Sequence, residues 1–373
     1  MVTEKAEIAD PGRKPSGPLR RGWTTGACAT AATKAALTAL LTGRFPDPVT
    51  ITLPKGETPS FALARETLGD DFAEAGIVKD AGDDPDVTHG ATIVARVARA
   101  SPGTGIAFRA GDGVGTVTKA GLPIAPDEPA INPVPRTMMT AEIEALCAQH
   151  GIAPDIEVTV SVPGGQALAE KTWNPRLGIV GGISILGTTG VVHPFSCSAW
   201  IHSIHRGIDV ARAAGQDHVL GATGSTSEAA AQALYGLPDF ALLDMGDFAG
   251  GLLKYLRAHP ISKLTIAGGF AKMTKLAQGA LDLHSGRSQV DMEFLLREAL
   301  AAGFDRSRSE RILQANTGQE VLELTRETGV DLATPIARLA RETAKKTLQD
   351  APVTVEVIIT DRKGNILART DFA

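Results

Sequence analysis

The sequence has little of several features that mark common protein classes. Only 4% of its 373 residues are aromatic, which leaves few rings for the stacking platforms that bind single-stranded nucleic acid. The formal net charge is -5 and the Lys and Arg residues are scattered, whereas duplex binding needs a concentrated basic stripe. No apolar run is long enough to span a bilayer. We therefore predict neither nucleic acid nor a membrane as a partner.

Cysteine is scarce as well. The three cysteines, Cys28, Cys147 and Cys197, are odd in number and far apart, which argues against a disulfide framework. Residues 1–20 are charged, rich in Pro and Gly, and lack the apolar core of a signal peptide, so they predict a flexible tail. Together these features predict a cytoplasmic protein.

What the chain does have is glycine and proline, 40 and 22 residues, placed as turns between predicted strands and helices. At about 150 residues per domain, the length suggests two domains. Residues 21–192 begin with a helix near 25–41 and continue with short strands, which predicts an N-terminal α+β domain. The strands are expected near 49–53, 60–65, 74–78, 91–97 and 156–162, with a helix near 138–150. The glycine-rich segment 173–194 resembles a junction between domains.

The second domain, residues 193–373, has a regular alternation. After a helix near 196–213, three strand–turn–helix units follow, with strands near 218–222, 240–243 and 264–267. Right-handed crossovers between such units give a Rossmann-like, doubly wound and mostly parallel sheet, with ligands at the carboxyl ends of the strands. Further helices and a hairpin at 353–360 and 366–369 close the chain. The predicted fold class is therefore α/β with two domains.

The turns after these strands predict the cofactor site. Asp244 lies 20 residues after Gly224 (244 − 224 = 20), the spacing at which an acidic residue holds a ribose in dinucleotide-binding folds. The first turn is not G-x-G-x-x-G, so a cofactor without a pyrophosphate, such as S-adenosylmethionine, fits better. The predicted cofactor-binding residues are Thr223, Gly224, Ser225, Asp244, Gly246, Asp247, Gly268 and Gly269. Helix capping is the alternative for both aspartates, and Ser225 with Glu228 predicts a capping box.

The segment from Lys263 to Asp291 combines a strand, a Gly-Gly turn, a helix and a polar loop. Phe270, Met273, Ala277 and Leu281 predict the packing side of the helix, while Lys272, Lys275 and Asp282 share the other side. His284, Ser285 and Arg287 follow within four residues. The charged side is either a ligand-binding edge or an ordinary solvated surface.

Other chemistries have weaker support. Cys197, His202 and His205 lie close together near His193, but their spacing matches no known zinc pattern, so we predict no protein-bound metal. An acidic loop at 79–86 lacks calcium-loop spacing and is expected to be a solvated turn. There is no G-x-S-x-G and no Walker A lysine, which disfavours serine hydrolase and P-loop kinase chemistry.

Several longer motifs closely resemble those of the CbiD family of cobalt-precorrin-5B C1-methyltransferases. They are GWTTGACATAATKAAL at 22–37, NPRLGIVGGISILGTTGVVHPFS at 174–196, GATGSTSE at 221–228, DMGDFAGG at 244–251 and GGFAKMTKLAQGALDLHSGRSQVD at 268–291. The resemblance implies methyl transfer from S-adenosylmethionine to C1 of cobalt-precorrin-5B, giving cobalt-precorrin-6A on the anaerobic route to cobalamin. Cobalt would then enter only as part of the substrate.

Such a substrate is a macrocycle rimmed with carboxylates, so cations in glycine-rich segments become candidate substrate ligands. These are Arg21, Arg176, Lys272, Lys275 and Arg287, together with Thr24 and Thr25 at an exposed helix start. Methyl transfer depends mainly on positioning and exclusion of water. For any proton movement we expect His284, or else Asp282 or Asp291, as the titratable groups nearest the cofactor edge.

Two other functions share part of this pattern. A nicotinamide-dependent oxidoreductase acting on a tetrapyrrole would use the same fold, and a non-catalytic corrinoid carrier would use the same cations. Titration with S-adenosylmethionine and with NADH separates the three. The oligomeric state stays open, with a homo-oligomer among the states allowed.

Overall fold

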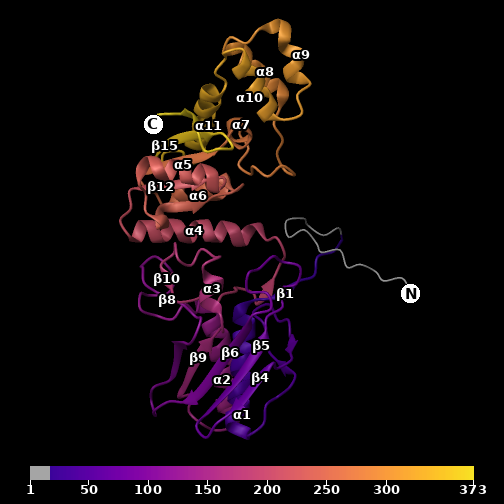
Figure 1. Cartoon of the computed structure of the whole chain (residues 1–373). Coiled ribbons are helices and arrows are strands. Elements are labelled where there is room, and N and C mark those ends of the chain that lie inside the picture. The colour runs from indigo at the N-terminus through magenta and orange to yellow at the C-terminus, as the bar shows by residue number, and fades with distance from the viewer. Residues whose placement is uncertain (1–16) are drawn as a thin grey trace, which may run out of the picture. The chain divides into compact units, whose positions relative to one another are not determined.

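The computed structural model describes residues 17–373, which form two compact units, one ending at Ser196 and one beginning at Cys197 (Figure 1). Both units mix helices and strands, so the predicted α/β class is confirmed. Residues 1–16 of the predicted tail lie outside the described residues. Within the described part of the chain, no helix is long and apolar enough to cross a membrane.

The first unit is built on a five-stranded sheet with the order β4-β5-β6-β9-β7. Neighbouring strands are antiparallel except β9 and β7, which are parallel. The sheet strands are β4 (Arg65–Leu68), β5 (Phe72–Val78), β6 (Thr92–Arg99), β7 (Ile106–Ala110) and β9 (Ile156–Ser161). The short strands are β1 (Gly22–Trp23), β2 (Val49–Thr50), β3 (Ser60–Phe61), β8 (Thr116–Val117), β10 (Ile179–Val180) and β11 (Val191–Val192). The helices are α1 (Thr25–Thr42), α2 (Pro133–Gln149) and α3 (Gly165–Ala169).

Helix α1 is the centre of this unit. It packs against α2 and against β5 and β6 (Figure 1). Its alanines and Cys28 are fully buried, because small side chains allow the helix to approach its neighbours closely. Burial raises the pKa of the Cys28 thiol to about 12. Thr24 caps the start, and Gly43 ends the helix with φ of 75°.

One prediction for this unit needs correction. Helix α2 begins at Pro133, five residues before the predicted start near Met138, because proline is tolerated in a first helical turn, where its missing N–H is not needed. The segment 173–194, expected near the junction between domains, lies at the end of the first unit, which closes at Ser196. Its strand β10 pairs with β8, and β11 pairs with β1.

The second unit contains a five-stranded sheet with the order β13-β12-β14-β15-β16. The first four strands are parallel, and β16 is antiparallel to β15. The strands are β12 (His218–Ala222), β13 (Leu242–Asp244), β14 (Lys263–Gly269), β15 (Thr354–Thr360) and β16 (Ile366–Arg369). The helices are α4 (Cys197–Ala213), α5 (Ser225–Tyr235), α6 (Ala249–Ala258), α7 (Phe270–Ala277), α8 (Met292–Ala301), α9 (Ser309–Leu313), α10 (Gly318–Glu327) and α11 (Ala333–Leu348). Short 3₁₀ turns cover Asp239–Ala241 and Arg306–Arg308.

The strands β12 and β14 are buried almost throughout, as continuous apolar runs in a parallel sheet should be. Helix α5 packs on β12 and β14, whereas α11 packs on β15 and against α6 and α7. The predicted packing residues Phe270 and Met273 are buried. Helix α7 ends at Ala277, however, so Leu281 belongs to the loop that follows and not to the helix.

The predicted capping residues are wrong. Helix α5 begins at Ser225 itself, with Gly224 at the cap position and no side-chain cap bond. Ser227, not Ser225, donates from its hydroxyl to the Gly224 carbonyl, over 2.9 Å. Asp247 does not cap α6 either, since that position belongs to Phe248.

Candidate functional site

The predicted cofactor residues come together at the carboxyl ends of three adjacent strands. Strand β12 lies between β13 and β14, and Ala222 is in register with Asp244 on one side and Ala267 on the other. The Thr223 N–H donates to the Ala267 carbonyl over 2.9 Å, and the Gly246 N–H donates to the Ala222 carbonyl over 3.0 Å. Thr223, Asp244 and Gly268 therefore share one edge of the sheet.

This edge leaves backbone open to a ligand at two points. A side-chain carbon added to Gly224 or Gly269 would meet no atom within 4 Å. At Gly268 the same carbon would lie only 2.6 Å from the Thr223 hydroxyl, so glycine is required there by packing. The open positions suit close approach of a ligand to the backbone, and the crowded one holds the strand ends together.

Trp200 of α4 is an aromatic residue at this edge that the sequence analysis missed. Its indole N–H donates to the Asp244 carbonyl over 2.9 Å, and the residue is 44% exposed. Gly246 adopts φ of 54°, and a side chain there would come within 3.3 Å of the indole ring. The ring is thus held at the end of β13 with much of its surface accessible. A tryptophan 44 positions before the aspartate has no local sequence signal that links the two.

Behind the edge, two lysines hold a loop in place. Lys272 forms an ion pair with Asp247 and donates to the Leu283 carbonyl over 3.1 Å. Lys275 donates to the same carbonyl over 3.0 Å, and the Leu283 N–H donates to the Asp247 carbonyl over 2.8 Å. We call Asp247, Lys272, Lys275 and Leu283 the Leu283 latch.

The latch corrects the expected role of the charged side of α7. Lys275 is only 6% exposed, so it is not part of a solvated charged surface. Burial, followed by the nearby charge of Lys272, lowers the pKa of Lys275. The two lysines in this arrangement hold the loop, and neither presents an unpaired charge to solvent.

The three predicted proton-handling residues lie in or next to this loop. Asp282 pairs with Arg287 and accepts from the His284 N–H over 3.1 Å. Burial opposes ionisation of Asp282, but the Arg287 hydrogen bond and charge outweigh it and lower the pKa of the carboxyl. Asp291 caps α8 by accepting from the Glu293 N–H over 2.8 Å. Both carboxylates are therefore already engaged by protein donors.

His284 is exposed, but its tautomer is constrained. The Gly286 N–H donates to its Nδ1 over 3.0 Å, so Nδ1 acts as an acceptor and the proton of the neutral ring sits on Nε2. In this conformation Nε2 is the hydrogen-bond donor of the ring. The arrangement suits a donor better than a general base.

In the first unit, Thr24 and Thr25 are buried rather than presented to a ligand. The Thr24 hydroxyl accepts from the Ala27 N–H over 3.2 Å, and the Thr25 hydroxyl accepts from the Leu186 N–H over 2.9 Å. Arg176 lies over the ring of Trp173, 5.7 Å from the ring centre. The threonines therefore tie the start of α1 to the glycine-rich segment.

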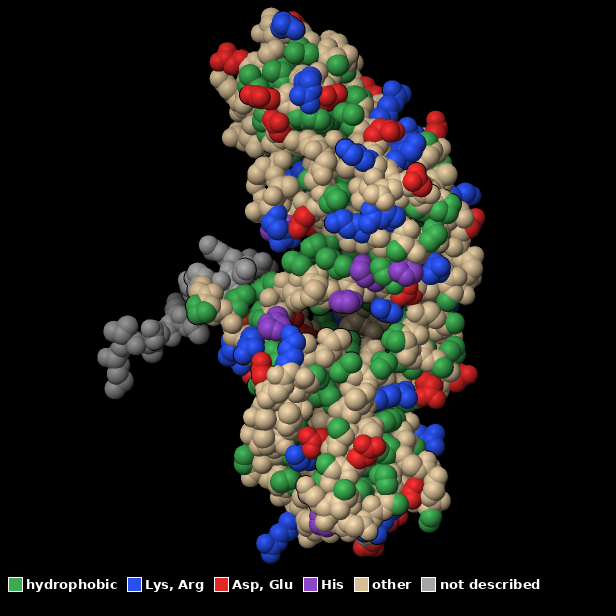
Figure 2. Space-filling view, turned by 180° about the vertical axis from the view of Figure 1, so that it is seen from behind, with side chains coloured by type: hydrophobic (Ala, Val, Ile, Leu, Met, Phe, Trp, Pro, Cys, Tyr) green, Lys and Arg blue, Asp and Glu red, His purple; other side chains and the backbone are tan. Residues whose placement is uncertain are grey.

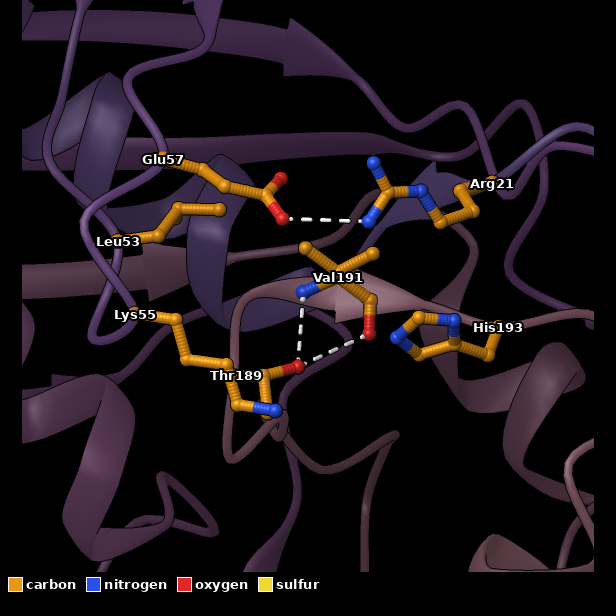
Figure 3. Close-up of a pocket in the computed structure, with 7 residues that line it drawn as sticks. All are labelled: Arg21, Leu53, Lys55, Glu57, Thr189, Val191 and His193. Atoms are coloured by element: carbon orange, nitrogen blue, oxygen red, sulfur yellow. Dashed lines mark hydrogen bonds and ion pairs between the residues drawn. The ribbon is translucent and has the colours of Figure 1, made fainter.

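Arg21 lines a pocket in the first unit with a volume of about 110 Å³ (Figure 3). Its Nη1 lies 3.2 Å from Oε1 of Glu57. We call this the Arg21 pocket, and its lining residues are Arg21, Leu53, Lys55, Glu57, Thr189, Val191 and His193. Of these residues, only Arg21 is predicted from the sequence to bind the substrate. The others come from segments more than 30 and more than 160 positions away, so no local pattern links them to Arg21.

Basic side chains form no single stripe on the one face that Figure 2 shows. On the face shown in Figure 2, lysine and arginine side chains are spread over both units, with acidic side chains among them. No group of three or more His, Cys, Asp or Glu residues in the described range could hold a metal ion. His205 instead stacks on Tyr255, with ring centres 3.9 Å apart.

Two family models match this chain. One, described as CbiD, covers residues 12–194, and the other, described as the C-terminal domain of CbiD, covers residues 282–371. Curated proteins from Brucella anthropi and Brucella canis are each 75% identical to the chain over 351 residues. The alignments cover 94% of this chain and 95% of each relative, and both relatives are named cobalt-precorrin-5B C(1)-methyltransferase.

Among solved structures, the chain is similar to the cobalamin biosynthesis protein (cbiD) from Archaeoglobus fulgidus. The two are 29% identical, and the match covers 73% of this chain and 84% of that one with a TM-score of 0.40.

Proposed function

The chain belongs to the CbiD family, and from that premise we propose that it transfers a methyl group from S-adenosylmethionine to C1 of cobalt-precorrin-5B, giving cobalt-precorrin-6A. The observation that carries the proposal is the 75% identity, over nearly the whole length, to relatives named for this reaction. Of the five motifs identified in the sequence, 22–37 and nearly all of 174–196 lie in the first matched region. The motifs at 221–228 and 244–251 lie between the two regions, and 268–291 crosses the start of the second.

We place S-adenosylmethionine at the carboxyl ends of β12, β13 and β14. The strand order β13-β12-β14 means that the chain leaves β12 in one direction and β14 in the other, the point at which doubly wound sheets bind ligands. A Rossmann-like description of the second unit is part of this proposal. The open backbone at Gly224 and Gly269 and the adjacent Asp244 are the features that fit such a ligand.

S-adenosylmethionine would supply an electrophilic methyl group on a sulfonium centre. Asp244 would accept hydrogen bonds from ribose hydroxyls, and Thr223 would contribute a hydroxyl beside them. Trp200 would cover the bound adenosine with its indole and keep water away. Each of these roles binds or orients, as a methyl transfer governed by positioning requires.

The remaining site residues take narrower roles in this proposal. His284 donates a hydrogen bond from Nε2 to the substrate, while Asp282 and Asp291 hold the loop and the start of α8. Arg21 and Arg287 are the partly exposed arginines proposed to bind substrate carboxylates, since each is more than two-fifths exposed at its side chain. Lys272 and Lys275 hold the loop through the Leu283 latch and do not bind substrate directly. Thr24 and Thr25 hold the start of α1 in place.

A cytoplasmic location is also proposed. Cys28 and Cys147 are both buried and unpaired, and Cys197 is exposed and unpaired. Unpaired thiols are typical of proteins from reducing compartments.

The test is a methylation assay with cobalt-precorrin-5B and S-adenosylmethionine, combined with binding of S-adenosylhomocysteine. Binding should quench the fluorescence of Trp200, and the quench should disappear in Trp200→Phe while Trp23 and Trp173 remain as internal references. NADH should neither bind nor support turnover. Tight NADH binding without binding of S-adenosylhomocysteine would instead favour an oxidoreductase.

A further inference from the structure

The Arg21 pocket combines an apolar floor with groups that can donate hydrogen bonds at its rim. Leu53 and Val191 are 2% and 9% exposed and form the floor. Arg21, Lys55 and His193 contribute a guanidinium, an ammonium and an imidazole around it (Figure 3). Such a combination suits a short carbon chain that ends in a carboxylate.

The backbone around the pocket is fixed before any ligand arrives. Gly22 follows Arg21, and a side-chain carbon at Gly22 would lie 2.1 Å from the carbonyl carbon of Ala81, so the chain is held tightly there. In the turn that carries Lys55, the Leu53 N–H donates to the Glu57 carbonyl over 2.8 Å. The Thr189 hydroxyl lies 3.2 Å from both the N–H and the carbonyl oxygen of Val191 (Figure 3). Three separate segments therefore meet in a defined geometry.

Glu57 shows how a carboxylate sits at this rim. It contacts Arg21 through one pair of atoms, Nη1 and Oε1, while a guanidinium has five N–H donors in all. Among the described residues, no second ion pair involves Arg21. A carboxylate from outside can therefore share or replace the Glu57 contact.

We propose that the Arg21 pocket is a subsite for one peripheral carboxylate side chain of the corrinoid, bound by Arg21, Lys55 and His193 in competition with Glu57. The proposal rests on the function proposed above, because it takes its ligand from that reaction. A volume of about 110 Å³ has room for a carboxyl group with one or two carbon atoms but not for a pyrrole ring system. The pocket would thus bind one side chain of the macrocycle and not its ring system.

The experiment measures binding of cobalt-precorrin-5B to the full chain, from the change in the corrinoid absorption spectrum, without a methyl donor. Arg21→Gln and Lys55→Gln should each weaken binding about tenfold, as loss of a charge-assisted hydrogen bond predicts. Glu57→Gln should tighten binding about threefold, because the competing carboxylate is gone. In turnover assays the first two variants should raise KM and leave kcat near the wild-type value.

Lys171→Gln is the matched control, since it removes one exposed positive charge from the same unit outside the pocket. A urea-unfolding profile and a far-ultraviolet circular dichroism spectrum like those of the wild-type chain show that a variant is folded, since all these substitutions lie in the first unit. His193→Gln replaces Arg21→Gln in the test if Arg21→Gln does not fold. Equal binding by Lys55→Gln and Lys171→Gln would overturn the subsite. Weaker binding by Glu57→Gln would overturn the competition. If the wild-type chain binds no corrinoid at all, the proposed function fails instead.

Discussion

The Leu283 latch and the Arg21 pocket use the same kinds of side chain for opposite purposes. In the latch, Lys272 and Lys275 both donate to one backbone carbonyl, and Asp247 neutralises one of them. In the pocket, Arg21 makes a single contact with Glu57, while its side chain stays 55% exposed. The comparison teaches that a cation in a glycine-rich motif can be part of the fold or part of a binding site, and that its contacts decide which.

The largest expected difference between the two regions is in stability. Lys275→Met should lower the free energy of unfolding by about 2 kcal/mol, because the Leu283 carbonyl loses a buried charged donor. Lys55→Met should change it by less than about 0.5 kcal/mol, since Lys55 is exposed. Urea unfolding of both variants measures the difference, and equal losses would abolish the distinction between latch and pocket.

A second prediction concerns cofactor binding at the strand edge beside the latch. Asp244→Asn should weaken binding of S-adenosylhomocysteine about tenfold, because hydrogen bonds from ribose to a carboxylate are stronger than those to an amide. Asp217→Asn is the control, as this exposed carboxylate pairs with Lys263 at the opposite end of β14. Calorimetric titration gives both affinities. Unchanged affinity in Asp244→Asn would show that the cofactor does not bind at this edge.

The third prediction concerns His284, which lies next to the latch but is exposed. If its Nε2 donates a hydrogen bond, His284→Gln should keep turnover within about threefold, since an amide can also donate, whereas His284→Ala should lose about tenfold. Methylation rates at saturating substrate provide the measurement. Equal and large losses in both variants would identify His284 as a base instead.

The smallest expected effect is the pH dependence of the Asp282–Arg287 pair. The folded-state pKa of Asp282 is lowered, so the pair contributes stability above the ordinary aspartate pKa of about 3.9 and loses it as pH falls below that value. The difference in urea midpoint between the wild-type chain and Arg287→Gln should therefore shrink between about pH 5 and pH 3. Because both side chains are partly exposed, salt should shrink it too. If the difference in urea midpoint stays constant across this pH range, the ionisation of Asp282 is not its cause.

The sequence predicted most of the second unit because its signals are local. Apolar runs that end at glycines place β12 and β14 correctly, and with them the shared edge of Thr223, Asp244 and Gly268. The predicted Gly-Gly turn is wrong, because Gly268 and Gly269 still pair with β15 as the last residues of β14. The latch could not be predicted in this way, since it depends on Lys272 of α7 meeting Asp247 and Leu283 from two separate loops. The helical pattern puts Lys275 on a polar face, but the loop that covers this face is a tertiary feature.

The first unit shows the same limit over longer distances. Arg21, Lys55 and His193 line one pocket although they lie in three separate parts of the sequence. The pairing of β1 with β11 brings Arg21 and His193 together, and strands of two residues leave no periodic pattern to read. Thr24 and Thr25 were expected at an exposed helix start, but the glycine-rich segment covers them.

The close packing of α1 also provides a chemical probe of how often the first unit opens. Cys28 is fully buried in the native state and its thiol stays protonated, so an alkylating reagent cannot modify it while the first unit is closed. When the unit opens, the thiol returns to its ordinary acidity and reacts. The modification rate of Cys28, followed by mass spectrometry beside the exposed Cys197, therefore counts the opening events of this unit alone.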